Sequence, residues 1–314
     1  MQKILRIGVI GTGSIAQTFH LPILSRMEDV EMTAVMSGHI ETAEKAKRTY
    51  HFEHASDNIN DFISAGLDCA FVLTPKPLHA SQAIPLLKAG IDVFCEKPLG
   101  MNLKEAAEMT EAAEKAGKHL MIGFNRRFAP VYQAAKKSYE TTKPDVIIAQ
   151  KNRPASEYRA TLENAIHMVD LMRFIAGEAT EVYAKGIFTD PDYETLTTAM
   201  LGFENGTVGM LIADRASGQW EETMELHGSN QTVFVNCPDS VTVVDSQQSH
   251  TTTLTPLAMG WARVEDKLGF RQSDEHFLEC CRTRVPPLTC AQDSFKTMEL
   301  MNRILKSAGL PDLE

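Results

Sequence analysis

Apolar runs alternate with amphipathic stretches along the first 124 residues. Strand-like runs occur at 4–10, 31–36, 68–73, 91–95 and 119–123, and stretches with helical periodicity lie between them at 14–26, 41–50, 78–89 and 102–116. This alternation predicts an α/β domain with a doubly wound parallel sheet. Ligands of such sheets bind at the carboxyl ends of the strands, so we expect the site among the residues that follow each strand.

The pattern changes after residue 124. Strand-like pieces then follow one another at 145–151, 181–188, 195–203, 206–214, 222–227, 231–236 and 241–245. The sequence Glu204-Asn205-Gly206 is a strong hairpin turn signal. We therefore expect a second domain over 125–314, built on an antiparallel sheet with one face toward the active site.

A glycine-rich segment, Gly11-Thr12-Gly13-Ser14-Ile15-Ala16, follows the first apolar run. Gly11 permits a tight turn, Gly13 lets the backbone approach phosphates, and Ala16 still allows the helix to pack closely on the strand. The start of the helix offers unpaired N–H groups and a positive dipole end to an anion. We expect a dinucleotide-binding Rossmann domain over 1–124, with its pyrophosphate contacts at Gly11, Gly13, Ser14 and Ile15.

The second strand ends at Ser37-Gly38-His39, where an NAD site usually carries Asp or Glu. No carboxylate is present to repel a 2′-phosphate, and Ser37 could donate a hydrogen bond to one. The arginine that often binds this phosphate is also absent, unless His39, Lys45 or Arg48 replaces it. Because the main discrimination against NADP is missing, we expect NADP to be favoured over NAD.

Further strand ends supply the other cofactor candidates. Lys97 follows a strand directly, beside an acid and before a proline, so it is placed to enter the cofactor crevice; a turn with a solvated lysine is the alternative. Asn125 and Arg127 could contact the cofactor or form a hydrogen-bonded linker, and His79 could contact it or cap a helix. The candidates at these strand ends are Thr74, Pro75, His79, Glu96, Lys97, Asn125 and Arg127.

Composition narrows the class of protein. The 314 residues carry a formal net charge of −10, which argues against nucleic acid or an anionic membrane as the main partner. No apolar run is long enough to cross a bilayer, and no signal-peptide pattern is recognised. The six cysteines have no CxxC or framework spacing and the ten histidines no metal-site spacing, so we expect reduced thiols, a cytoplasmic protein and no metal.

Taken together, these motifs resemble the glucose–fructose oxidoreductase / inositol dehydrogenase (Gfo/Idh/MocA) family. The resemblance covers nearly the whole chain and is closest to the branch named for bacterial virulence factors. The segments that carry it, in chain order, are GTGSIA, Thr74-Pro75 with His79, LLKAG at 86–90, CEKPL at 95–99, GFNRRFAP at 123–130, IHMVDLMRFIAG with His167 and Asp170, and the run from DEHFLECC to MNRIL.

The resemblance implies an N-terminal Rossmann domain and an α+β C-terminal domain with an open-faced, mostly antiparallel sheet. It also implies an NAD(P)-dependent oxidoreductase that transfers hydride between nicotinamide C4 and a carbinol or carbonyl carbon of a sugar, cyclitol or related polyol. Family members commonly pair the free face of the sheet, which implies a homodimer or homotetramer.

The resemblance also implies catalytic residues. Lys97 matches the proton-transfer or substrate-anchoring lysine of the family. His167 matches the histidine of an Asp-x-x-x-His pattern, in which i, i+4 spacing puts both side chains on one helix face. Glu163 stands at the Asp position, so this chain departs from the pattern by one methylene. We expect His167 or Lys97 to exchange the hydroxyl proton and Glu163 to orient the imidazole or bind a substrate hydroxyl.

Polar side chains on the cofactor side of the second sheet would select the substrate. Several arginines and a lysine near one mouth would suit a polyol that carries a carboxylate or phosphate. The candidates are Lys151, Arg153, Tyr158, Arg159, Arg215 and Trp220.

Two other functions stay open on the sequence alone. A regulator that senses nucleotides could keep the fold and lose the chemistry, and the change to Glu163 slightly favours it. An NAD-dependent glycosidase would use the cofactor only transiently.

Overall fold

The structure is a computed structural model that describes residues 3–154, 159–188, 194–254 and 263–314. It divides into two compact units, of which the first contains 1–124 and 270–298 and the second 125–269 and 299–314. The sequence pattern assigns all of 125–314 to the second domain, whereas residues 270–298 belong to the first unit. The reason is that helix α9 (Phe270–Thr283) packs on η1 (Ala16–His20) and α1 (Leu21–Leu24).

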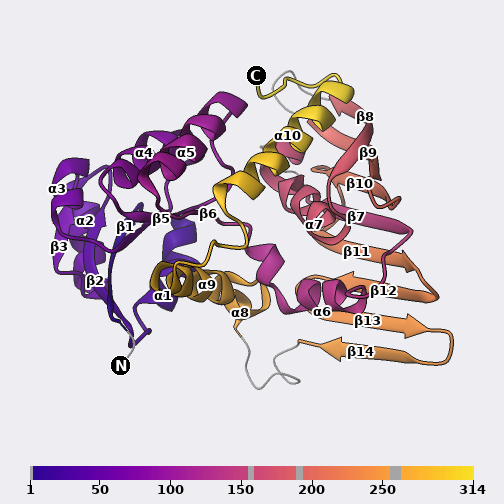
Figure 1. Ribbon diagram of the computed structural model, residues 1–314, viewed down its shortest axis with the longest axis horizontal. Helices are drawn as coiled ribbons and strands as arrows, with labels where there is room; N and C mark the ends of the chain where they lie inside the picture. Colours follow the sequence, from indigo (N-terminus) through magenta and orange to yellow (C-terminus); the bar gives the residue numbers. More distant parts are fainter. Residues whose placement is uncertain (1–2, 155–158, 189–193, 255–262) are drawn as a thin grey trace. The chain divides into compact units, whose positions relative to one another are not determined.

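The first unit contains the predicted parallel sheet (Figure 1). Its six strands lie in the order β3-β2-β1-β4-β5-β6, and every neighbouring pair is parallel. The strands are β1 (Leu5–Ile10), β2 (Val30–Met36), β3 (His54–Ser56), β4 (Cys69–Val72), β5 (Asp92–Cys95) and β6 (Leu120–Ile122). The Rossmann prediction is confirmed. Strand β3 was not predicted, because three half-polar residues carry no apolar alternation.

Helices cover both faces of this sheet. Helix α4 packs on α5 and β5, whereas α9 packs on η1 and α1, and Figure 1 shows these two groups on opposite faces. Helix α5 is capped at both ends, because the Asn102 side chain accepts from the Glu105 N–H at 2.8 Å and Gly117 ends the helix with φ of +61°. The remaining helices are α2 (Ile40–Tyr50), α3 (Ile59–Ser64), η2 (Lys76–Leu78), α4 (His79–Lys88) and α5 (Leu103–Ala116).

The second unit is built on one large sheet, ordered β14-β13-β12-β11-β7-β10-β9-β8. Only the β7–β10 pair is parallel, so the prediction of a mostly antiparallel sheet is confirmed. The strands are β7 (Val146–Asn152), β8 (Ala179–Phe188), β9 (Glu194–Phe203), β10 (Val208–Asp214), β11 (Glu221–Gly228), β12 (Gln231–Asn236), β13 (Ser240–Asp245) and β14 (Ser249–Thr253). Strand β14 was not predicted, because its sequence SHTTT is polar throughout.

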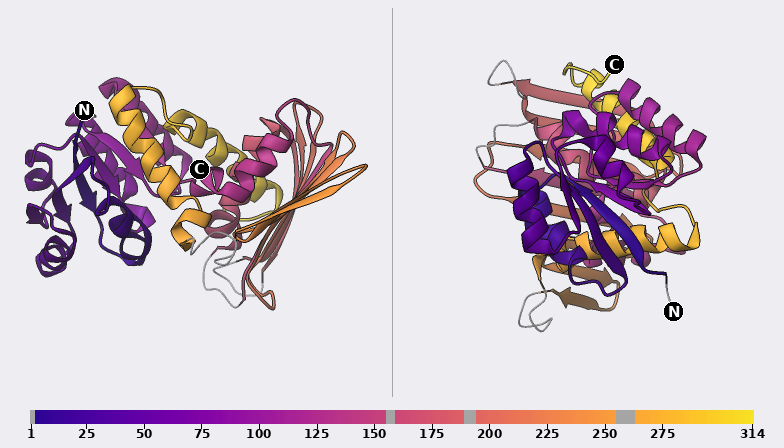
Figure 2. Two further views of the ribbon diagram at one scale, coloured as in Figure 1. Left: turned by 90° about the horizontal axis from the view of Figure 1, so that it is seen from below. Right: turned by 90° about the vertical axis from the view of Figure 1, so that its left-hand side faces the viewer.

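The predicted hairpin at Asn205-Gly206 joins β9 to β10. Gly206 has φ of +83°, and its N–H donates to the Phe203 carbonyl at 2.9 Å. Helices α6 and α7 pack on one face of the sheet, and Figure 2 shows the other face without a helix among the described residues. The helices are η3 (Asn125–Phe128), α6 (Pro130–Ser138), η4 (Ala160–Ala165), α7 (Ile166–Ala176), α8 (Val264–Lys267) and α10 (Ala291–Ser307), which begins in the first unit and ends in the second.

Candidate active site

The loop after β1 has the backbone geometry expected of a phosphate cradle. Gly11 has φ of +97°, and a Cβ atom there would lie 2.7 Å from the Leu73 carbonyl oxygen, so only glycine fits. A Cβ atom on Gly13 would meet no atom within 4 Å. Gly13, Ser14 and Ile15 are exposed, so the loop offers open main chain of the kind that a pyrophosphate fits.

A groove of about 360 Å³ lies beside this loop within the first unit. The register pairs Ile10 with Val72 and Val72 with Cys95, so the segments that follow β1, β4 and β5 start at one level. The groove therefore brings together the predicted residues Ile15, Thr74, Pro75, Glu96 and Lys97; Leu73, Lys76 and Pro77 also line it.

The end of β2 is neutral, as the sequence indicates. The Thr12 hydroxyl donates to the Ser37 hydroxyl at 3.3 Å, which connects the glycine loop to this strand end. Gly38 has open space where a side chain would be, and His39 is exposed in front of α2. Ser37, Gly38 and His39 thus stand at the same carboxyl edge of the sheet as Gly11.

His79 is buried rather than open to a ligand. Its Nδ1 lies 3.0 Å from the Pro98 carbonyl oxygen and its Nε2 lies 3.1 Å from the Thr74 carbonyl oxygen. Burial lowers the pKa of His79. The side chain therefore ties the loop after β4 to the segment that carries Lys97, and acts on the groove by positioning its walls.

Sequence reasoning missed a buried group of charges behind the groove. His20 is fully buried between Asp274, 2.9 Å from its Nδ1, and Glu96, 3.2 Å from its Nε2. Glu96 was predicted as a cofactor residue, but no signal linked it to His20 or to Asp274. The partners of His20 are 76 and 254 residues away in sequence, beyond the reach of any local pattern.

Asn125 and Arg127 form internal contacts of the second unit. The Asn125 amide donates to the Leu268 carbonyl at 3.0 Å. Arg127 makes a bidentate ion pair with Asp170 at 2.7 and 2.6 Å and lies over the Phe174 ring. Both side chains are buried, which matches the linker alternative of the sequence analysis.

His167 and Glu163 lie on consecutive helical segments. Glu163 is in the π-helical turn η4 and His167 is the second residue of α7. Four residues correspond to about one turn of either helix type, so the two side chains stay on one face. Glu163 is half-buried and His167 is buried.

Lys151 was predicted at the mouth of a substrate site, and the structure corrects this. Its ammonium is buried and pairs with Glu222, which also binds Arg126 at 2.6 and 3.0 Å and accepts from Tyr132 at 3.3 Å. Burial lowers the pKa of Lys151 to about 7, although the Glu222 carboxylate opposes that shift. The lysine is part of an ionic core under the sheet, because an isolated Glu222 would be costly to bury.

The half-buried Arg153 pairs with the exposed Trp220. The Arg153 guanidinium lies 3.9 Å from the centre of the Trp220 ring, and its Nε donates to the Asn164 side chain at 3.1 Å. Trp220 keeps 55% of its surface exposed. Arg215 instead donates from Nε to the Glu194 carbonyl at 2.8 Å, and Arg159 donates to the Pro311 carbonyl at 2.7 Å.

Tyr158, the remaining substrate candidate, lies outside the described residues.

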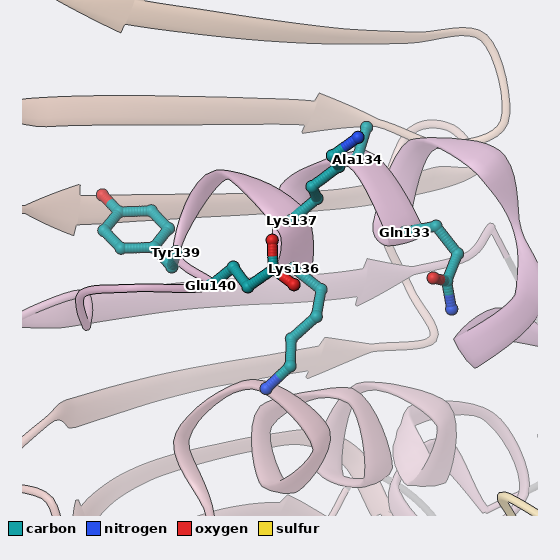
Figure 3. Close-up of a pocket in the computed structure, with 6 residues that line it drawn as sticks. All are labelled: Gln133, Ala134, Lys136, Lys137, Tyr139 and Glu140. Carbon is teal, nitrogen blue, oxygen red and sulfur yellow. The ribbon is translucent and has the colours of Figure 1, made fainter.

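A second pocket, of about 460 Å³, lies on α6 in the second unit (Figure 3). Figure 3 shows Lys136 directed away from α6 toward a neighbouring helix, and its ammonium donates to the Phe174 carbonyl at 2.8 Å. The residues that line this pocket are Gln133, Ala134, Lys136, Lys137, Tyr139 and Glu140. None of the predicted site residues is among them, so this pocket is separate from the candidate site.

The described residues contain neither a metal cluster nor a membrane-spanning helix. No group of three or more His, Cys, Asp or Glu side chains there could hold a metal ion. Among the same residues, no helix combines the length and apolar character needed to cross a membrane.

The glycine loop, the neutral end of β2 and the groove that contains Lys97 define a nucleotide-dependent oxidoreductase of the Rossmann class. A family model described as "Oxidoreductase family, NAD-binding Rossmann fold" matches residues 5–124, and the C-terminal domain model of the same family matches residues 139–234. The chain belongs to the Gfo/Idh/MocA oxidoreductase family, as its motifs indicated. It is an enzyme that binds an NAD(P)-type nucleotide and transfers hydride.

Individual relatives agree with this assignment. The chain is 28% identical to a myo-inositol 2-dehydrogenase from Thermotoga maritima over 92% of each chain. A crystal structure of the dehydrogenase MviM from Clostridium difficile has a TM-score of 0.89 at 24% identity, covering 97% of this chain and 100% of that one. A levoglucosan dehydrogenase in complex with NADH and L-sorbose has a TM-score of 0.86 at 21% identity, with both chains fully covered. The last two similarities concern the fold.

The two glycines of the loop should fail in different ways when each is changed to alanine. Gly11→Ala introduces a clash and a strained φ, so we expect a loss of about 1–3 kcal/mol in the free energy of unfolding, measured by urea denaturation. Gly13→Ala should fold like the wild type but bind NADPH at least about tenfold more weakly in a fluorescence titration, because its Cβ occupies the approach to the phosphates. Wild-type affinity in Gly13→Ala would contradict the assignment of the cradle.

Proposed function

We propose that the enzyme transfers hydride between a nicotinamide nucleotide and a carbinol or carbonyl carbon of a sugar, cyclitol or related polyol. The observation that carries this proposal is the shared groove of the first unit, in which Lys97 and Ile15 of the glycine loop are both wall residues. The myo-inositol 2-dehydrogenase above and a D-apiose dehydrogenase from Paraburkholderia graminis, 24% identical over 96% of this chain and 86% of its own, support the substrate class.

The residues of the chain divide the chemistry between them. Gly11, Gly13, Ser14 and Ile15 hold the pyrophosphate, and Thr74, Pro75 and Glu96 line the groove beyond it. When bound, the nicotinamide supplies or accepts the hydride. Lys97 exchanges the proton of the reacting hydroxyl, a role that suits an ammonium at the wall of a half-buried groove.

We infer that η4 and α7 of the second unit also carry functional residues. His167 binds or exchanges a proton with the substrate, and Glu163, one turn earlier, sets the imidazole tautomer or binds a substrate hydroxyl. Arg153 and Trp220 are the substrate-selecting candidates that the structure favours, because an exposed indole and a guanidinium beside it suit a sugar ring with an anionic substituent. The dehydrogenases reported above favour this function over a regulator or a glycosidase.

We propose a cytoplasmic location. All six cysteines are free, as expected of a protein that folds in a reducing compartment.

We propose that the nucleotide is preferentially NADP. Ser37, Gly38 and His39 present no carboxylate to the 2′ position, and the exposed side chains of Lys45 and Arg48 stand on the helix that follows. The NADH of the levoglucosan dehydrogenase structure belongs to that protein and makes NAD the competing choice.

The free face of the second sheet supports assembly into a homodimer or homotetramer. Strand register places one row of side chains across that face, at Tyr183, Met200, Met210, Ile148, Glu225 and Phe234. Tyr183 is 63% exposed, Met200 48%, Met210 45% and Phe234 42%, so the row is a mainly apolar patch with Glu225 as its charged member. A second copy of the same face would cover this patch through a two-fold axis.

Replacing the proposed proton-transfer residue tests the mechanism. Lys97→Met should abolish turnover with every polyol of a broad panel while leaving nucleotide affinity within about threefold of wild type, because the cradle is unchanged. Lys76→Met removes a similar charge from the same groove and should retain turnover. Turnover by Lys97→Met at the wild-type rate would refute the role.

The cofactor preference is tested by comparing thermal shifts with NADPH and NADH. We expect the larger shift with NADPH. Ser37→Asp should weaken NADPH binding at least about tenfold and leave NADH binding equal or improved, because the new carboxylate repels a phosphate and accepts from a hydroxyl. A larger shift with NADH in the wild type would overturn the preference.

Light scattering after size exclusion tests the assembly. The wild type should elute as a dimer or tetramer, and Met210→Glu should shift it to monomers, because the interface would bury an unpaired charge at its centre. Lys104→Glu, an exposed charge change on α5, should leave the mass unchanged. A monomeric wild type at about 50 μM, well above the Kd of a stable dimer, contradicts the proposal.

A further inference from the structure

Three distant segments of the first unit meet in a buried chain of charges. Asp274 on α9, His20 at the end of η1 and Glu96 after β5 are linked through the two nitrogens of the imidazole. The side chains of His20 and Asp274 have no exposed surface. A carboxylate faces each ring nitrogen, an arrangement that favours an imidazolium, in which both nitrogens donate.

This series of hydrogen-bonded charges ends at the backbone N–H of Lys97. One Glu96 oxygen, Oε1, accepts from His20, and the other, Oε2, accepts from the Lys97 N–H at 3.2 Å. A Cβ atom on Gly123 would lie 2.9 Å from Glu96 Oε1, so the glycine of this neighbouring strand end leaves room for the carboxylate. Both oxygens of Glu96 are thus held, and its orientation is coupled to the backbone that presents Lys97.

Aromatic rings enclose the imidazolium. Phe94 and Phe270 each approach it edge-on at 5.4 Å between centroids, and Phe71 lies at 6.2 Å. The enclosure excludes water, which strengthens the ionic hydrogen bonds inside it. Burial alone would lower the pKa of His20, but Asp274 and then Glu96 outweigh it and raise the pKa to about 10.

We propose that His20 is a positioning residue for Lys97, acting through Glu96 and oriented by Asp274. The imidazolium holds the Glu96 carboxylate, and the carboxylate holds the main chain at the position from which the lysine enters the groove. This proposal rests on the catalytic role given to Lys97 above. The contribution of His20 to the rate is geometric: it holds the proton-transfer group in position. A small displacement of such a group lowers the rate of reaction far more than it weakens binding.

Two variants and a matched control test the proposal. His20→Gln removes the imidazolium charge. Asp274→Asn removes the charge of the carboxylate that orients His20 and keeps the shape of the side chain. Asp92→Asn is the control, because Asp92 is a buried carboxylate paired with Arg284 at the opposite, amino-terminal end of β5. His20→Gln and Asp274→Asn should lower kcat about tenfold or more with nucleotide KM within about threefold, whereas Asp92→Asn should keep wild-type kcat in its folded fraction.

A spectroscopic readout makes the result independent of turnover. Ring ¹⁵N shifts of labelled histidine in the full-length wild-type protein should include one imidazolium that persists at pH 8.5, and Asp274→Asn should move its titration to lower pH. The sign follows from the loss of a carboxylate that favours the charged ring. The titratable and charged groups around this chain are Asp274 and Arg271 on α9, Glu96 and Lys97 after β5, and His79 on α4.

The outcomes separate this proposal from the proposed function. If His20→Gln and Asp274→Asn keep wild-type kcat while Lys97→Met is inactive, the positioning role is wrong and the function stands. If Lys97→Met keeps the wild-type rate, the catalytic role of Lys97 is wrong and the positioning role of His20 falls with it, whatever the spectrum shows. If His20→Gln does not fold, the kcat of Asp274→Asn decides whether the positioning role is right. A wild-type spectrum in which every imidazole is neutral at pH 8.5 overturns the proposal.

Discussion

Parallel pairing of the central strands is the constraint on which the candidate site depends. A parallel sheet brings the carboxyl ends of its strands to one edge, and the register sets Ile10, Val72 and Cys95 at one level there. Segments 63 and 86 residues after Gly11, which begin at Thr74 and Lys97, thereby become walls of one groove. The backbone ladder thus assembles the groove, and the side chains that follow each strand determine what it can hold.

Buried ionic groups then fix the positions of segments that the hydrogen bonds between strands do not hold. In the first unit the imidazolium of His20 joins the segment after β5 to a helix from the far end of the chain. In the second unit Glu222 gathers Arg126 and Lys151 beneath the sheet. Buried charges of this kind are expensive to desolvate and are tolerated because each is fully paired, so their main effect is on which arrangement is adopted.

Local patterns were sufficient for most of the fold. The alternation of apolar runs and amphipathic stretches predicted the parallel sheet, and hairpin spacing predicted the antiparallel one, because both signals come from side chains within a few residues of each other. Short polar strands such as His54–Ser56 and Ser249–Thr253 carry no such signal, since pairing with a neighbour stabilises them and their own side chains do not. Residues 270–298 were assigned to the second domain for a similar reason, because no local pattern shows that they pack on the first unit.

In the candidate site, too, some features follow from local sequence and others depend on residues that are distant in sequence. The sequence by itself determined the glycine loop, the neutral end of β2 and the presence of a lysine at a strand end, because each depends on a short stretch of backbone and its own side chains. Tertiary structure alone decided that His79 is a buried strut, that Lys151 belongs to an ionic core, and that Asp274 stands behind Glu96. Burial and charge pairing depend on groups that are remote in sequence, and a side chain's chemical identity does not reveal which partner it will meet.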